Sequence, residues 1–293
     1  MPNDIHIILS VLKQPDVLAI VLGGSYCVGL QNDTSDIDIC IYYDSDINIP
    51  RLNTALSKID DDHASRILLP LNTWGIWQNS GGVCLINGKE YDITLRNVAF
   101  MEQIVNETIL GNIYCIHNPA YPFGYCSSYL IGEIDNCHTL FSASNKLLRL
   151  KQKVYANKNN ICQSIIQFFL EDAIFQCICS IKAEFACDMP YRNAAIKNCA
   201  FSLLNVYAAQ KNILLFHNKK VNKRILSAYC TDQLSSLPDN VQFILDVFSS
   251  GLDNIEKTCH SVGRLIICEV ESNLTTLKTP ANYALLKTLI NQN

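Results

Sequence analysis

The sequence has few charged residues and no long run of basic ones. Charged side chains make up 17% of the 293 residues, and 23 basic against 27 acidic residues leave a formal net charge of −4. Proteins that bind nucleic acid without sequence preference carry a basic patch or stripe, because neutralisation of phosphates supplies their affinity. We therefore expect no long nucleic acid among the partners.

Metal-binding patterns of cysteine and histidine are also missing. None of the 14 cysteines stands in a Cys-x-x-Cys pair, and the six histidines form no pair at helical or strand spacing. Structural zinc sites depend on such close pairs, so the pattern argues against zinc. We interpret the cysteines as buried thiols that pack like small apolar side chains in a reducing compartment.

The sequence offers no segment that we would assign to secretion or to a membrane. Residues 1–14 lack a basic segment followed by an apolar core and a small-residue cleavage site, so we expect no signal peptide. Residues 108–132 contain no Asp, Glu, Lys or Arg, but Pro119, Pro122 and Gly124 would interrupt a membrane helix. We expect a cytoplasmic protein without a membrane partner.

Apolar residues are abundant enough for a substantial core. They make up 49% of a chain whose length allows one large domain or two of ordinary size, and we favour two. The first hundred residues alternate strand-like and helix-like patterns. Asn87-Gly88 is a favoured pair for a hairpin turn. The predicted strands are 18–22, 37–43, 82–86 and 90–95, and the predicted helices are 49–59 and 98–110.

Beyond residue 138 the pattern is helical, and we find no pair of strands there. In residues 161–181 the apolar positions recur at the spacing of a core-facing helix. We therefore predict an α+β protein. Its expected parts are a domain with a small mixed sheet at 1–115, a packed linker at 116–137 and an all-α helical bundle at 138–293.

One segment combines glycines, a serine and two acids. Gly23-Gly24-Ser25 is followed, after ten residues, by Asp36-Ile37-Asp38. Successive side chains of a strand alternate between its faces, so Asp36 and Asp38 present their carboxylates on one face, where a hard divalent cation would bind. The glycines allow the backbone to turn close to a phosphate, to which Ser25 and nearby amides can donate.

A third acid, Asp92, lies on a later predicted strand between Tyr91 and Ile93. Three carboxylates are enough to hold two magnesium ions. Two acids at this spacing also arise by chance, as Asp44 and Asp46 show. The glycine-serine turn and the third acid together make the pattern specific.

The combination resembles the signature of the polymerase β-like nucleotidyltransferase superfamily over residues 18–96. The residues that carry the resemblance are Gly23–Gly29, Ser35–Asp38, Trp74–Trp77 and Tyr91–Arg96. Bacterial members with a helical C-terminal half, broadly similar to antibiotic nucleotidyltransferases, share these features. The resemblance implies a nucleotidyltransferase domain at 1–115.

The resemblance also implies roles for individual residues. The expected catalytic and metal-binding residues are Asp36, Asp38 and Asp92, which would hold two Mg²⁺ ions. The expected nucleotide-binding residues are Gly23, Gly24, Ser25 and Arg96, with a nucleoside triphosphate, ATP in first place, as co-substrate. In antibiotic nucleotidyltransferases an acid from the helical half can act as the general base, which makes Glu171 a candidate; a solvated or salt-bridged helix position is the alternative, and Glu133 stands in the same position.

The chain departs from the family pattern just after the serine. Many members carry basic residues there, where this chain has Tyr26, Cys27 and Val28. The positive charge for a triphosphate must then come from elsewhere. The candidates are Arg96, Lys146, Arg149 and Lys151.

The sequence leaves the acceptor open. By similarity to antibiotic-modifying relatives we expect a small molecule with a hydroxyl group, and the protein itself could form a homodimer. One alternative is transfer of AMP to a protein side chain, as in toxin-antitoxin nucleotidyltransferases. Another is a non-catalytic nucleotide sensor or interaction module.

Overall fold

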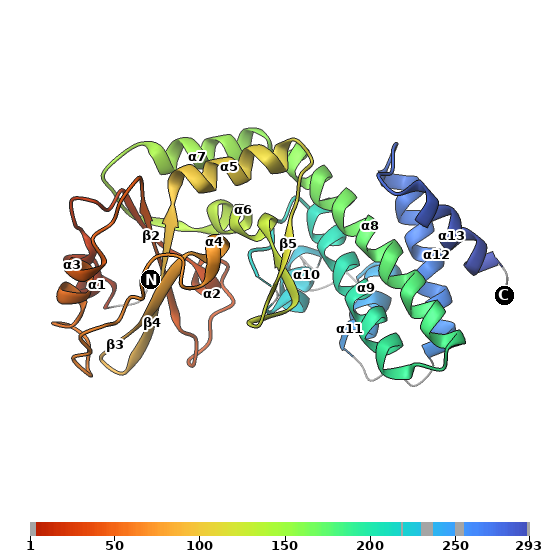
Figure 1. The fold of residues 1–293 in the computed structure, drawn as a ribbon, viewed down its shortest axis with the longest axis horizontal. Helices are drawn as coiled ribbons and strands as arrows, with labels where there is room; N and C mark the ends of the chain where they lie inside the picture. Colours follow the sequence, from red (N-terminus) through yellow and green to blue (C-terminus); the bar gives the residue numbers. More distant parts are fainter. Residues whose placement is uncertain (1–3, 218, 230–236, 250–254, 292–293) are drawn as a thin grey trace. The chain divides into compact units, whose positions relative to one another are not determined.

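The computed structural model describes residues 4–217, 219–229, 237–249 and 255–291. A five-stranded mixed sheet in the N-terminal part is followed by a largely helical C-terminal half, which confirms the α+β class (Figure 1). The strands are β1 (Ala19–Leu22), β2 (Ile37–Tyr43), β3 (Ser80–Ile86), β4 (Lys89–Asn97), β5 (Cys115–Asn118), β6 (Tyr121–Cys126) and β7 (His138–Ser142). The helices up to β7 are α1 (Ile5–Leu12), α2 (Gly24–Cys27), α3 (Ile49–Leu56), α4 (Gly75–Gln78), α5 (Val98–Ile109) and α6 (Ser127–Asn136). Those after it are α7 (Lys146–Ala156), α8 (Lys158–Phe185), α9 (Met189–Gln210), α10 (Val221–Tyr229), α11 (Asp239–Ser249), α12 (Ile255–Asn273) and α13 (Pro280–Asn291).

Contacts between residues divide the chain into two compact units. The first unit contains residues 1–108 and 127–157, and the second contains residues 109–126 and 158–293. This division differs from the predicted boundaries at 115 and 138. The predicted linker contains β6 and α6, of which β6 belongs to the second unit and α6 to the first.

The sheet of the first unit has the strand order β3-β4-β2-β1-β7. β2 and β4 run parallel, and the other described neighbours run antiparallel. The predicted hairpin is confirmed: Asn87 and Gly88 join β3 to β4 with φ angles of 50° and 73°, the left-handed pair that a tight hairpin turn requires. The segment that we expected to be helical from residue 138 begins with a strand, because β7 pairs with β1 and completes that edge of the sheet.

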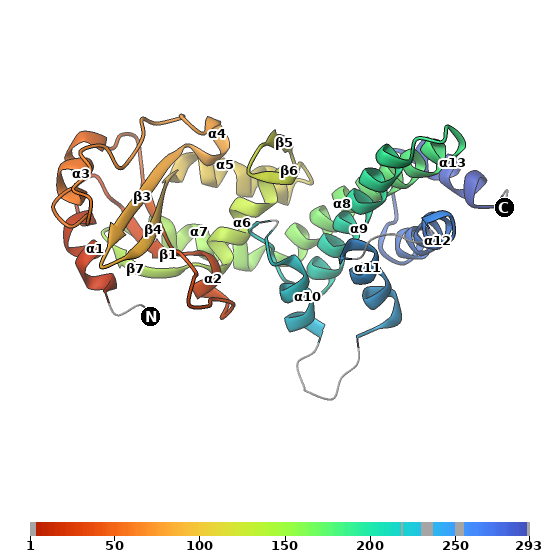
Figure 2. The ribbon, with the colours of Figure 1, turned by 90° about the horizontal axis from the view of Figure 1, so that it is seen from below.

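The two faces of this sheet have different characters. Ile37, Ile39 and Ile41 of β2 point into a hydrophobic core that also contains Ile8 of α1 and Leu56 of α3. Figure 2 shows α1 and α3 on this side of the sheet and α5 and α6 on the other. Burying one such isoleucine side chain contributes roughly 2 kcal/mol. The strand alternation therefore sends the intervening residues of β2 to the opposite face.

In the second unit α8 packs against α9, α12 and α13. Helix α8 contains the predicted core-facing helix at 161–181, which is confirmed. By length and composition α8 could also cross a membrane, but 61% of its most apolar window is buried within the structure, as in the core helix of a helical bundle. Helix α9 begins after Asp188, whose side chain accepts a hydrogen bond from the backbone N–H of Tyr191, a helix cap that satisfies an otherwise unpaired donor.

Candidate active site

The three predicted acids lie together at one face of the sheet. The parallel register pairs Asp38 of β2 with Asp92 of β4, and Asp36 lies two residues before Asp38 on the approach to β2. Ligand oxygens of all three carboxylates lie within 4.8 Å of one another. Asp36 is exposed, whereas Asp38 and Asp92 are half-buried. The three carboxylates that the sequence selected thus form one cluster.

This cluster fits a hard divalent cation. Its described ligand atoms are all carboxylate oxygens, which Mg²⁺ prefers. Three like charges at this separation repel one another, and a bound cation removes the repulsion. The exposure of Asp36 leaves the cluster open on one side for a substrate.

The glycine turn lies directly against Asp38. The backbone N–H of Gly23 donates a hydrogen bond of 2.8 Å to the carbonyl oxygen of Asp38, which ties the end of β1 to β2. Gly24 has a φ of +58°, a left-handed conformation that favours glycine, and the Asp38 carboxylate fills the space that a Cβ on Gly24 would take. Both glycines therefore shape the backbone beside the acid cluster.

Ser25 follows this turn with a hydroxyl that has no partner. Its side chain is 6% exposed, and its Oγ forms no hydrogen bond within the described structure. A buried hydroxyl without a partner costs about 1–3 kcal/mol. An oxygen atom of a bound phosphate would satisfy it, so the geometry of the turn fits the predicted role of Ser25.

Arg96 is held by a carboxylate and a backbone carbonyl of the first unit. Its guanidinium donates to the Glu133 carboxylate at 2.9 Å from Nη2 and 3.2 Å from Nε, and to the carbonyl oxygen of Gln78 at 2.8 Å. The Arg96 side chain is 7% exposed. These contacts fasten β4 to α6 and to the end of α4. The contact of Arg96 with a nucleotide stays a prediction, and so does the role of Glu133 as a base.

Lys151 of α7 acts electrostatically on Cys27, shortly after the glycine-serine turn. Burial raises the pKa of the Cys27 thiol to about 11, and the charge of Asp38 also raises it, whereas a backbone hydrogen bond at His138 and the positive charge of Lys151 lower it. Both charges therefore act on Cys27, two residues after Ser25. Lys146, another candidate, forms an ion pair with Asp44.

Glu171 lies on α8 in the second unit, where its carboxylate already has partners. It accepts hydrogen bonds from the backbone N–H of Lys278 at 2.6 Å and from the hydroxyl of Thr279 at 3.2 Å. These bonds hold the segment after α12 against α8. The observed contacts are structural, and the role of Glu171 as a general base stays a prediction.

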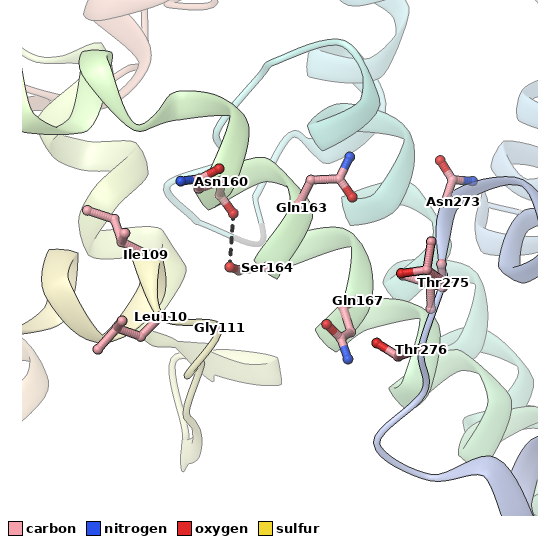
Figure 3. A pocket seen from close by; sticks show the side chains of 11 residues that line it. Ile109, Leu110, Gly111, Asn160, Gln163, Ser164, Gln167, Asn273, Thr275 and Thr276 are labelled. Atoms are coloured by element: carbon pink, nitrogen blue, oxygen red, sulfur yellow. Dashed lines mark hydrogen bonds between the residues drawn. The ribbon is translucent and has the colours of Figure 1, made fainter.

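A cavity of about 300 Å³ lies beside this segment in the second unit. Figure 3 shows Gln163 and Gln167 of α8 facing Thr275 and Thr276 across it. None of the side chains that line it carries a charge. Carboxamide and hydroxyl groups therefore set its chemistry, and no local sequence pattern marks these residues, because they come from segments far apart in the chain.

Comparison with known proteins supports the family. Residues 5–107 match the family model of the nucleotidyltransferase domain. No curated protein matches the chain. The chain is similar, with a TM-score of 0.45 and 8% sequence identity, to a nucleotidyltransferase-like protein from Exiguobacterium sibiricum 255-15, over 99% of this chain and 79% of the other. The acid cluster and the glycine turn both lie within the matched segment, and residues 5–107 are a nucleotidyltransferase domain.

Proposed function

We propose that the protein transfers a nucleoside monophosphate from a nucleoside triphosphate, ATP in first place, to an acceptor hydroxyl, with Mg²⁺ at the acid cluster. The observation that carries the proposal is the convergence of three carboxylates within 4.8 Å beside a glycine turn. In the reaction the acceptor oxygen attacks the α-phosphorus and the bond to the β-phosphate oxygen breaks. Pyrophosphate leaves, and the acceptor proton passes to a base or to water.

Each residue of the cluster has a role in this proposal. Asp36, Asp38 and Asp92 hold the metal, and bound magnesium supplies charge neutralisation and a lowered pKa of the acceptor hydroxyl. Ser25 donates its unpartnered hydroxyl to a phosphate oxygen. Catalysis then consists mainly of positioning and charge stabilisation.

The missing basic residues after Ser25 have a substitute in this proposal. Lys151 supplies the positive charge that compensates the triphosphate. Support comes from its electrostatic effect on Cys27, next to the turn. The ammonium group of Lys151 donates a hydrogen bond to the carbonyl oxygen of Cys137. This acceptor is uncharged, so the bond does not neutralise the positive charge of Lys151.

For the acceptor we propose a small molecule with a hydroxyl group, such as an antibiotic. The support is the resemblance to antibiotic nucleotidyltransferases and the helical C-terminal half. Transfer of AMP to a protein hydroxyl would use the same chemistry on the nucleotide. The acceptor therefore has to be found by experiment.

The test is pyrophosphate release from each of the four ribonucleoside triphosphates with Mg²⁺, with and without aminoglycosides, lincosamides and candidate proteins. We expect the release of pyrophosphate to depend on one class of acceptor. In Asp36→Asn and Asp92→Asn its rate should fall at least ~100-fold, because a group that stabilises the charge of the transition state is lost. Asp46→Asn is the matched control, because Asp46 is an exposed acid outside the cluster. Binding of a triphosphate without release of pyrophosphate in the presence of any of these acceptors would contradict the transferase and favour the sensor.

A further inference from the structure

A second cavity in the second unit combines aromatic walls with one carboxylate. Its volume is about 210 Å³, and residues of the β5–β6 hairpin, α8 and α9 line it. The lining includes Phe123 of β6, Phe168 and Phe169 of α8, and Phe201 of α9. Asp172 of α8 is the acidic residue of the lining, which contains no lysine, arginine or histidine.

The phenyl rings form fixed walls. Phe123 stacks on Phe201 with ring centroids 4.5 Å apart and an interplanar angle of 15°. Phe168 and Phe169 meet edge to face at 5.1 Å. Phe169 and Phe201 are almost fully buried, so packing holds the position of these two walls. The faces of such rings attract cations through their quadrupole.

Asp172 has neutral partners. The hydroxyl of Ser202 donates to its Oδ2 at 2.5 Å, and the amide of Gln176 reaches its Oδ1 only at 3.5 Å. Its carboxylate forms no salt bridge within the described residues. Burial raises the pKa of Asp172, which the hydrogen bonds from Ser202 and Gln176 partly oppose. Asp172 is half-buried, and a carboxylate that is partly removed from water is stabilised by a cationic partner, because desolvation is costly for an unpaired charge.

The bond from Ser202 alone has a structural explanation, since it links α9 to α8. That explanation covers Oδ2. It does not explain the position of Oδ1, whose contact with Gln176 is longer than an ordinary hydrogen bond. Nor does it explain why this carboxylate lines an aromatic cavity.

We propose that this cavity binds a small organic ammonium ion, with the ammonium group at Oδ1 of Asp172 and the organic part against the phenyl rings. A charge-assisted hydrogen bond to Asp172 and cation–π contacts would both favour a cation over a neutral molecule of the same shape. The inference concerns a ligand site of the second unit and does not depend on nucleotidyl transfer.

The test is isothermal titration calorimetry of the full chain with benzylammonium chloride. Benzyl alcohol is the neutral probe of the same shape, and tetramethylammonium chloride is the cation without a ring. We expect benzylammonium to bind at least tenfold more tightly than benzyl alcohol and to lose at least tenfold in affinity in Asp172→Asn. The matched control is Asp246→Asn, because Asp246 lies on the exposed side of α11 and pairs with Gln242 across one helical turn, as Asp172 does with Gln176.

Circular dichroism and thermal unfolding test whether Asp172→Asn is folded. If that variant does not fold, the comparison of benzylammonium with benzyl alcohol on the unchanged protein decides. Equal affinity for the two probes, equal binding by Asp172→Asn, or no binding of either ammonium probe would overturn the proposal.

Discussion

The carboxylate of Asp38 occupies the space beside Gly24: an ideal Cβ on Gly24 would lie 1.6 Å from Oδ2 of Asp38. The glycine of the turn and the acid of the strand are therefore one structural unit. A side chain at residue 24 would have to displace a member of the acid cluster.

Gly24→Ala is expected to disable the site. The left-handed φ of residue 24 costs an alanine about 1–2 kcal/mol, and the added Cβ would in addition push the Asp38 carboxylate out of the cluster. We expect pyrophosphate release to fall by roughly two orders of magnitude, as for other losses of transition-state charge stabilisation. The control is Gly29→Ala, since Gly29 has a φ of +67° and nothing within 4 Å of an added Cβ. Similar losses of activity in both variants would contradict this explanation.

Asp92→Asn is expected to separate metal binding from folding. Removing one of three clustered carboxylates reduces their repulsion, so the metal-free variant should unfold at the same temperature as the unchanged protein or higher. Mg²⁺ with ATP should raise the unfolding temperature of the unchanged protein, because a ligand at 100 times its Kd adds about 2.7 kcal/mol to the free energy of unfolding. The unfolding temperature of the variant should not rise. Differential scanning fluorimetry measures both effects. A metal-free variant that unfolds at a clearly lower temperature would argue for a structural role of Asp92.

Arg96→Met should destabilise the first unit. The substitution leaves Glu133, whose side chain is 16% exposed, without its cationic partner, which costs about 3 kcal/mol for a buried pair. Arg51→Met is the control, because Arg51 is 41% exposed in its pair with Asp16 and such a pair contributes less than about 1 kcal/mol. Denaturant unfolding gives both values.

The same variant tests the predicted contact of Arg96 with the nucleotide. A loss of stability with an unchanged KM for the triphosphate would assign Arg96 to the structure alone. A tenfold or larger rise in KM, measured where the variant is fully folded, would support nucleotide binding.

His217 is expected to make stability depend on pH. Burial, aided by nearby basic residues, lowers its pKa from 6.5 to about 4, so the folded protein keeps it neutral while the unfolded chain takes up a proton below pH 6.5. Stability from this residue is present above pH 6.5 and is lost as pH falls toward 4, by up to ~3 kcal/mol. Urea unfolding measured from pH 7 to pH 4 gives the free energy of unfolding at each pH. This free energy should fall less steeply with falling pH in His217→Gln, and as steeply as in the unchanged protein in His117→Gln, since His117 is exposed. If the free energy of unfolding of His217→Gln depended on pH as that of the unchanged protein does, His217 would not be the source of this pH dependence.

Much of the local structure follows from the sequence. The glycine-serine turn, the alternation that puts Asp36 and Asp38 on one face, and the Asn87-Gly88 hairpin each depend on a few neighbouring residues. The long helix α8 follows from the spacing of its apolar residues. These features could be predicted because backbone geometry and side-chain periodicity act over short stretches of chain.

The partners of these elements were decided by tertiary structure alone. The parallel register that sets Asp92 beside Asp38 joins strands more than fifty residues apart, and β7 becomes a strand because it pairs with the edge of β1. The ion pair of Arg96 with Glu133 and the aromatic cavity around Asp172 arise in the same way. Such contacts join residues distant in sequence, and no local pattern records which distant residues will meet.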